Sequence, residues 1–117
     1  MKAVPPQALQ GHDMLVARSR ALHWAVADRL RAQPELVALA RQNLERWITT
    51  ERQHGHVSPG LLEWKRILDT RPIEAILELL CEESEAADRL RHATPFCGIL
   101  TEEERAAIYQ HYAALPA

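Results

Sequence analysis

Apolar residues recur at three- and four-residue steps along most of the chain, and prolines and glycines divide this pattern into segments of helical length. Such spacing places the apolar side chains on one face of each helix. No segment alternates apolar and polar residues over the length of a strand, so we expect no β-sheet. The pattern predicts an all-α protein, a single bundle of five or six short helices.

The first 50 residues predict two helices. Asp13 is a capping residue ahead of the first, with Ser19 as an alternative, later start. This helix should end near Ala32, because the residue before Pro34 disfavours helical backbone. Pro34 suits the first turn of the second helix, which should extend to Thr50. The apolar face of the first helix consists of Leu15, Leu22, Val26 and Leu30, and that of the second of Leu36, Val37, Ala40, Leu44, Trp47 and Ile48.

The second half predicts four shorter helices after a polar linker at residues 51–57. The first three should span residues 58–70, 72–81 and 84–94, with Ser58 and Ser84 as caps, and the last should begin at Thr101. Thr101 and Glu104 have the spacing of a capping box, which indicates a firm start for the last helix. The predicted core consists of Leu44, Trp47, Leu62, Trp64, Ile76, Leu77 and Leu80.

The length of 117 residues suits one domain, and the hydrophobic (47%) and charged (26%) fractions are typical of globular proteins. Residues 1–12 lack a periodic pattern and predict a mobile N-terminal arm; residues 13–117 should form the single helical domain. The N-terminus lacks the apolar region of a signal peptide, and no apolar run could span a membrane. We therefore expect a cytoplasmic protein without a membrane partner, in which Cys81 and Cys97 are reduced thiols.

The charge is unevenly distributed. Residues 1–50 carry seven basic and four acidic groups, and the remainder carries seven basic and twelve acidic groups. The net charge of +3 in the first part predicts weak nucleic-acid contact through residues 1–50 at best, because nucleic-acid binders usually have a larger basic excess.

Candidate chemistry is sparse. His54 and His56 have chelating spacing, but no further ligand stands at a zinc-like distance from them, so we expect no metal or cofactor. No serine or cysteine lies in a glycine-framed turn, and no glycine-rich phosphate loop is present, so no catalytic residue is predicted. Two arginine–histidine pairs, Arg18 with His23 and Arg105 with His111, match the motif of the small all-α HEPN ribonucleases, although about two such matches are expected by chance.

The segment from Pro95 to Leu100 is too apolar for an ordinary solvent-exposed loop. It either staples the last helix to the core or forms a docking surface for a partner. Trp24 lies off the apolar stripe of its helix, and an exposed tryptophan often marks an interface. The candidate partner-binding residues are Pro95, Phe96, Gly98, Leu100, Ile108, Tyr109 and Trp24.

Two stretches together resemble a known group of proteins. Residues 19–30 (SRALHWAVADRL) resemble the opening, and residues 94–109 (TPFCGILTEEERAAIY) the ending, of a group of short bacterial proteins, with a similar layout between them at residues 36–47 and 58–80. Members of this group are small, helical and mostly uncharacterised, and are often encoded beside a toxin such as a nucleotidyltransferase or a PIN-type nuclease. The resemblance covers roughly residues 19–112 and implies an antitoxin-like role.

These observations predict a non-enzymatic, protein-binding regulator, in its most concrete form the neutralising partner of a bacterial toxin encoded by a neighbouring gene. A DNA-binding regulator that uses the basic N-terminal half and a small HEPN-like ribonuclease are the alternatives. A homo-oligomer also stays open at this point.

Overall fold

The computed structural model describes residues 12–114, which form six α-helices, one short 3₁₀-helix and no strand. The all-α prediction is confirmed. None of the helices in these residues has the length and apolar character needed to cross a bilayer. The elements are α1 (His12–Ala32), η2 (Pro34–Leu36), α2 (Val37–Gln53), α3 (Pro59–Thr70), α4 (Ile73–Cys81), α5 (Glu85–Arg91) and α6 (Glu102–Ala113).

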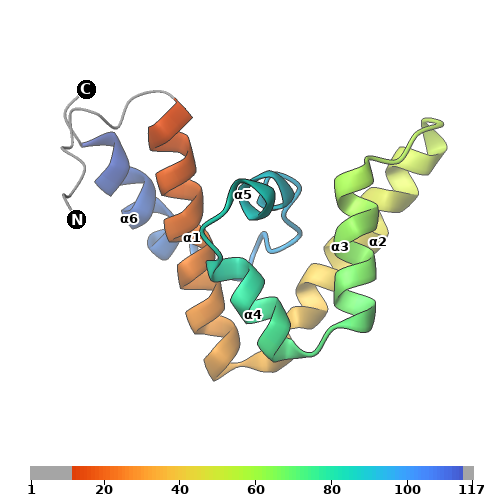
Figure 1. Ribbon diagram of the computed structural model, residues 1–117, viewed down its shortest axis with the longest axis horizontal. Coiled ribbons are helices and arrows are strands. Elements are labelled where there is room, and N and C mark those ends of the chain that lie inside the picture. Colours follow the sequence, from red (N-terminus) through yellow and green to blue (C-terminus); the bar gives the residue numbers. More distant parts are fainter. Residues whose placement is uncertain (1–11, 115–117) are drawn as a thin grey trace.

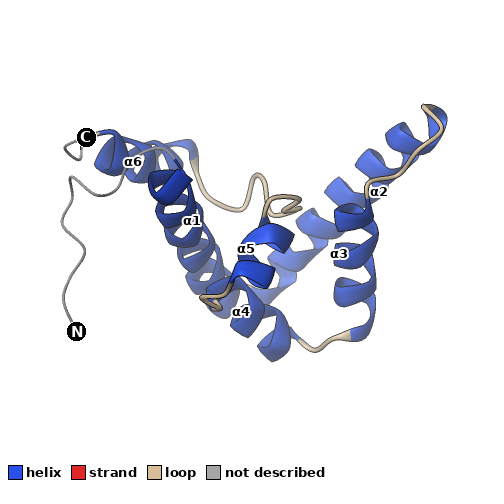
Figure 2. Ribbon diagram, turned by 45° about the horizontal axis from the view of Figure 1, so that its top comes forward, coloured by secondary structure: helices blue, strands red, loops and turns tan. Residues whose placement is uncertain are grey.

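The helices form two arms that diverge from a shared base (Figure 1). Helices α1 and α6 pack along each other as one arm, the α1–α6 arm, and the hairpin of α2 and α3 forms the other, the α2–α3 arm. Helix α4 packs against α1, and α5 lies between the arms, in contact with α1, α3 and α4 (Figure 2). The buried hydrophobic residues of α1, α2, α3, α4 and the segment after α5 form one continuous core.

The core is centred on Trp64 of α3, which is fully buried. Its ring meets Phe96 edge-on, with 5.3 Å between the ring centroids. Its indole Nε1 donates a hydrogen bond of 2.8 Å to the carbonyl oxygen of Leu90. One side chain thus joins α3 to α5 and to the segment from Thr94 to Leu100, called the 94–100 loop below.

Helix α3 begins in close contact with the segment that follows α5. A Cβ atom placed on Gly60 would lie 2.7 Å from the Cβ atom of Ala93, which is too close for two carbon atoms that are not bonded. The absence of a side chain at position 60 therefore lets the two backbones approach each other.

The predicted core is confirmed in part. Leu44, Trp64, Ile76 and Leu80 are buried. Trp47 and Leu77 are only half-buried, and the prediction for Leu62 is wrong, because 43% of it is exposed. Leu61, Trp64, Ile67 and Leu68 already occupy the inner face of α3, so Leu62 points away from the core.

Leu15, predicted on the inner stripe of α1, is 48% exposed, because it lies in the first turn of α1, whereas the buried residues of this helix lie between His23 and Leu30. Asp13 lies inside the first turn of α1 instead of preceding it. The arm predicted at residues 1–12 lies outside the described residues except for His12, which is helical.

The polar segment after α2 is shorter than predicted. Helix α2 continues to Gln53, so that Glu51 is helical and faces the start of α3. Its carboxylate accepts hydrogen bonds from the backbone N–H of Ser58 (2.6 Å) and from the Ser58 hydroxyl (3.1 Å). The Ser58 side chain therefore does not cap α3, whereas the predicted caps Ser84 and Thr101 are confirmed.

Candidate functional site

A pocket of about 370 Å³ opens between α1, the 94–100 loop and α6. Pockets that take small ligands have volumes of roughly 300–1,000 Å³. The apolar part of its lining comes from three separate elements and consists of Leu22, Val26, Phe96, Leu100 and Tyr109. Polar groups from His23, Thr94, Glu102 and Arg105 complete it, so the site has an apolar interior with a few polar atoms.

Hydrogen bonds from α2 hold the loop that forms one wall. The side-chain amide of Asn43 is buried and donates to the carbonyl oxygens of Pro95 (2.9 Å) and Cys97 (3.0 Å). The chain then turns at Gly98, whose φ of 88° lies in the left-handed region that favours glycine. Two fixed carbonyls and a glycine turn give this wall a defined shape in the absence of any partner.

Polar contacts hold α6, which forms the opposite wall. Its first turn is closed by the capping box between Thr101 and Glu104, and the Glu104 carboxylate also pairs with Arg29 of α1. The hydrogen bond from the Thr101 backbone is the main cause that lowers the pKa of Glu104. Helix α6 is therefore fixed at its N-terminal end, beside the pocket.

His23 contributes a neutral imidazole to the pocket. The residue is buried in α1, and its Nδ1 donates to the carbonyl oxygen of Ser19 at 2.7 Å, because a carbonyl can only accept. Burial lowers the pKa of His23, and the nearby positive charge of Arg91 adds to this effect. With Nδ1 engaged, Nε2 is the ring nitrogen that remains for another contact.

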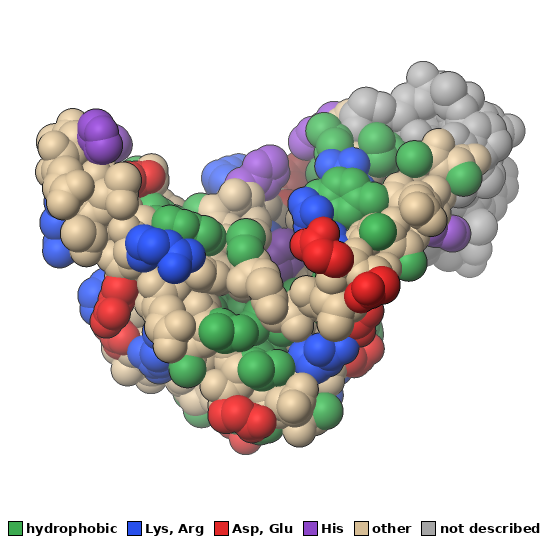
Figure 3. All heavy atoms as spheres, turned by 180° about the vertical axis from the view of Figure 1, so that it is seen from behind, with side chains coloured by type: hydrophobic (Ala, Val, Ile, Leu, Met, Phe, Trp, Pro, Cys, Tyr) green, Lys and Arg blue, Asp and Glu red, His purple; other side chains and the backbone are tan. Residues whose placement is uncertain are grey.

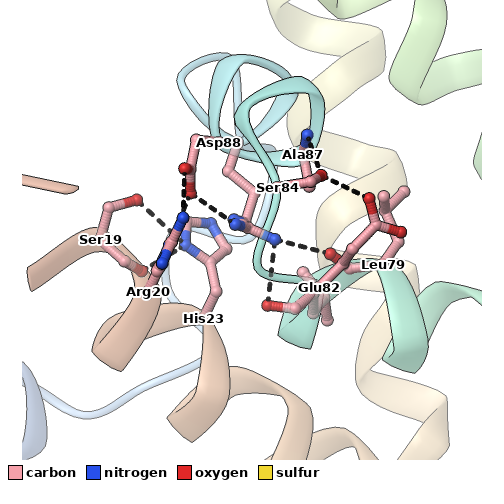
Figure 4. Close-up of polar contacts among 10 residues, drawn as sticks. Ser19, Arg20, His23, Leu79, Glu82, Ser84, Ala87 and Asp88 are labelled. Carbon is pink, nitrogen blue, oxygen red and sulfur yellow. Dashed lines mark hydrogen bonds and ion pairs between the residues drawn. The ribbon is translucent and has the colours of Figure 1, made fainter. Parts of the chain in front are cut away.

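Beside His23, a charged network connects α1 to α4 and α5 (Figure 4). Arg20 makes two hydrogen bonds to the Asp88 carboxylate, at 3.0 and 2.7 Å, and Arg91 adds a third at 2.7 Å. The bond from Arg20 is the largest cause that lowers the pKa of Asp88 to about 2. The side chain of Arg91 is fully buried and also donates to the Leu79 carbonyl oxygen, so this network is a structural joint.

The structure separates the candidate partner-binding residues into those that line the pocket and those that do not. Phe96, Gly98, Leu100 and Tyr109 come together around the pocket. Pro95 is fully buried and Ile108 is half-buried; neither lines the pocket. Phe96 is only 4% exposed and packs on Trp64, so it forms the pocket floor and staples the core rather than projecting as an anchor.

Trp24 is 47% exposed, as its position off the apolar stripe predicted. It lies apart from this pocket, in a more open hollow of about 700 Å³ that Arg20, Glu83 and Asp88 also line. The exposed tryptophan and the pocket are therefore two separate features of α1.

In each of the two arginine–histidine pairs, the arginine and the histidine contact different groups. The guanidinium groups of Arg18 and Arg105 both lie over the Tyr109 ring. His23 is bonded to its own helix, and His111 packs edge-on against Tyr112. His54 and His56 are exposed at the tip of the α2–α3 arm, and residues 12–114 contain no group of three or more possible metal-binding side chains.

The basic residues of the N-terminal half are largely paired. Four of its arginines form ion pairs with carboxylates. Each carboxylate partly offsets the positive charge that a phosphate group would contact. The four arginines are Arg20, Arg29, Arg31 and Arg41.

Sequence reasoning missed His23 and Asn43, and it expected the wall residues Leu22 and Val26 only on the apolar face of the first helix. Asn43 interrupts the apolar face of α2, and a polar residue on such a stripe is the signal that could have identified it. His23 follows Leu22 on α1 but gives no comparable signal, because its partner is a backbone carbonyl of the same helix.

Comparisons with protein-family models, with curated proteins and with solved structures found no match for this chain. The functional argument therefore depends on the geometry of the pocket.

Proposed function

We propose that the chain is a non-enzymatic, protein-binding regulator, most concretely the neutralising partner of a bacterial toxin encoded by a neighbouring gene. The pocket between α1, the 94–100 loop and α6 is the observation that carries this proposal, because it offers a preformed, mainly apolar recess to a partner's side chain. The toxin as the partner comes from the resemblance of residues 19–30 and 94–109 to proteins encoded beside toxins.

The construction of the pocket favours binding of a protein segment. Its loop wall is held by Asn43 and its helical wall by the Thr101–Glu104 capping box. Walls that are ordered before binding lose less conformational entropy when a partner arrives. Interface residues that contribute most of the binding energy are typically aromatic side chains that fill such pockets.

A protein partner is also favoured over DNA by the charges on the surface. Four arginines of the basic half are neutralised by carboxylates of this chain, and the α4–α5 region carries exposed glutamates such as Glu74, Glu82 and Glu85. An acidic surface repels the phosphate backbone.

The proposal is tested by filling the pocket. Leu22→Trp places a large side chain at the pocket wall, and Leu62→Trp makes the same change on the exposed face of α3 as the matched control. Each variant is co-expressed with the neighbouring gene product, after a thermal melt has shown that it is folded, and the affinity is measured by calorimetry. We expect Leu22→Trp to weaken binding roughly 30-fold or more and Leu62→Trp to leave it unchanged.

Two outcomes would contradict the proposal. If the neighbouring gene product does not bind the wild-type chain, the toxin-neutralising role is wrong. If it binds folded Leu22→Trp as tightly as the wild type, the pocket is not the docking site.

A further inference from the structure

Two arginines converge on one aromatic ring next to the pocket. The Cζ atom of Arg18, from α1, lies 4.2 Å from the centroid of the Tyr109 ring, and the Cζ atom of Arg105 lies 4.6 Å from it. Arg105 also donates a hydrogen bond to the Tyr109 hydroxyl. On the α1–α6 arm, Lys and Arg side chains lie among hydrophobic ones, with Asp or Glu side chains beside them, on the face seen in Figure 3.

Neither guanidinium group has a carboxylate partner among the described residues. Within residues 12–114, Arg18 and Arg105 form no ion pair with a carboxylate, although seven other pairs are present. Glu102 also lines the pocket, but it pairs with neither arginine, and Glu104 is already engaged by Arg29. Of the two arginines, only Arg105 lines the pocket, with Glu102 as the carboxylate nearest to it in the lining; Arg18 borders a neighbouring hollow and reaches the shared Tyr109 ring from there.

The interior of the same pocket is mainly apolar and therefore fits an uncharged part of a ligand. Its walls are Leu22, Val26, Phe96 and Leu100, and His23 adds a buried ring without a full charge. A ligand that fits both parts has an apolar body with an anionic group at one end.

We propose that the pocket binds an apolar group, best an aromatic ring, with a carboxylate close beside it, the ring lying in the pocket and the carboxylate pairing with Arg105 at the pocket and with Arg18, which shares the Tyr109 ring. The inference rests on the proposed function, because the partner would supply this chemistry as an aromatic residue beside an acidic one. Guanidinium groups bind carboxylates through charge-assisted hydrogen bonds, which are stronger than bonds between neutral groups.

The inference is tested first with 3-phenylpropionate as the probe and 3-phenylpropionamide as its neutral match. Binding is followed by NMR through the backbone amides of residues such as Leu22, Gly98 and Leu100. We expect saturable shifts at these amides with 3-phenylpropionate and binding roughly tenfold weaker with the amide. Equal affinity of the two probes, or shifts confined to residues outside the pocket, would overturn the inference.

Variants identify the arginines that take part. Arg105→Gln should weaken 3-phenylpropionate binding roughly tenfold, and Arg18→Gln should weaken it in the same direction. Arg89→Gln, on the exposed surface of α5, is the matched control and should leave the affinity unchanged. If Arg105→Gln and Arg18→Gln both bind the probe as tightly as the wild type, the carboxylate is not recognised by this pair and the inference is wrong.

A partner experiment separates this inference from the proposed function. If 3-phenylpropionate binds in the pocket but the neighbouring gene product binds nowhere, the ligand is a free amphipathic acid and the proposed function is wrong. If the gene product binds the wild type, Arg105→Gln and Arg18→Gln with equal affinity, the proposed function stands and the carboxylate inference is wrong.

Discussion

Helices α3 and α6 have the same length of 12 residues, but they are stabilised in opposite ways. Helix α3 buries Leu61, Trp64, Ile67 and Leu68. Helix α6, all of whose residues are described, buries none. It is held by a capping box, by the Arg29–Glu104 ion pair and by half-buried contacts such as Tyr109. Helix α3 is thus stabilised by its buried side chains, and α6 by its cap and by polar and half-buried contacts. The candidate site lies beside α6.

The largest effect is expected from the centre of the core. Trp64→Ala removes a fully buried ring, its contact with Phe96 and its hydrogen bond to Leu90. It should lower the free energy of unfolding by about 3–5 kcal/mol, as measured by urea denaturation. Tyr109→Ala in α6 is the comparison and should cost less than half as much, because Tyr109 is only half-buried. Equal losses would show that α6 contributes to stability as much as α3 does.

The pH dependence of the free energy of unfolding should reveal the contribution of the Arg20–Asp88 pair, which connects α1 to α5. Asp88 has a pKa of about 2 in the folded protein, below its ordinary value of 3.8. A depressed carboxyl pKa stabilises the fold above the ordinary value, and this contribution is lost as the pH falls from about 4 to 2. We expect a loss of about 1 kcal/mol, kept small because the carboxylate retains contact with water. Asp88→Asn should abolish this component of the pH dependence in urea unfolding experiments; an unchanged acid profile would assign it to other carboxylates.

The capping box between Thr101 and Glu104 should stabilise α6 without affecting the rest of the fold. Thr101→Ala removes the side-chain acceptor of the Glu104 backbone N–H and should cost about 1 kcal/mol. Because α6 contributes no buried residue, the change should appear as faster hydrogen exchange within α6 while the core amides of α3 stay protected. Thr101→Ser keeps the hydroxyl and should retain slow exchange. Loss of protection throughout the chain would mean that α6 unfolds together with the core.

The smallest effect is expected on the outer face of α3. Leu62→Ala removes an exposed side chain and should change the free energy of unfolding by at most about 0.5 kcal/mol. A thermal melt compared with that of Trp64→Ala provides the measurement. A loss of more than about 2 kcal/mol would mean that Leu62 is covered in solution, for example by a second copy of the chain.

The sequence predicted the helices well where local chemistry decides them. The prolines at 34, 59 and 72 and the caps at Ser84 and Thr101 depend on backbone groups within a few residues, so their effects can be read from the chain. Leu62 was misassigned because an apolar pattern identifies a stripe but not its width. How much of the stripe is covered depends on which helices pack against it, and α3, packed against α2 and α5, already buries Leu61, Trp64, Ile67 and Leu68.

The candidate site was predicted less well, because tertiary contacts assemble it. The loop residues Phe96, Gly98 and Leu100 and the helical residue Tyr109 were identified from local composition. Their common wall on α1, formed by Leu22 and Val26, could not be paired with them without the fold. The meeting of Arg18 and Arg105 at one ring joins residues 87 positions apart and has no local signature.

The close approach at Gly60 also bears on how the sequence can vary. A methyl group at position 60 would occupy the space of the Ala93 methyl group, so one small volume serves two positions. In sequences with this fold, we expect alanine at position 60 to accompany glycine at position 93. The two sites then behave as one inherited unit. A side chain gained at position 60 alone displaces the start of α3 and, with it, the Trp64 ring that joins this helix to the floor of the pocket, whereas Ala93→Gly alone only leaves a small void.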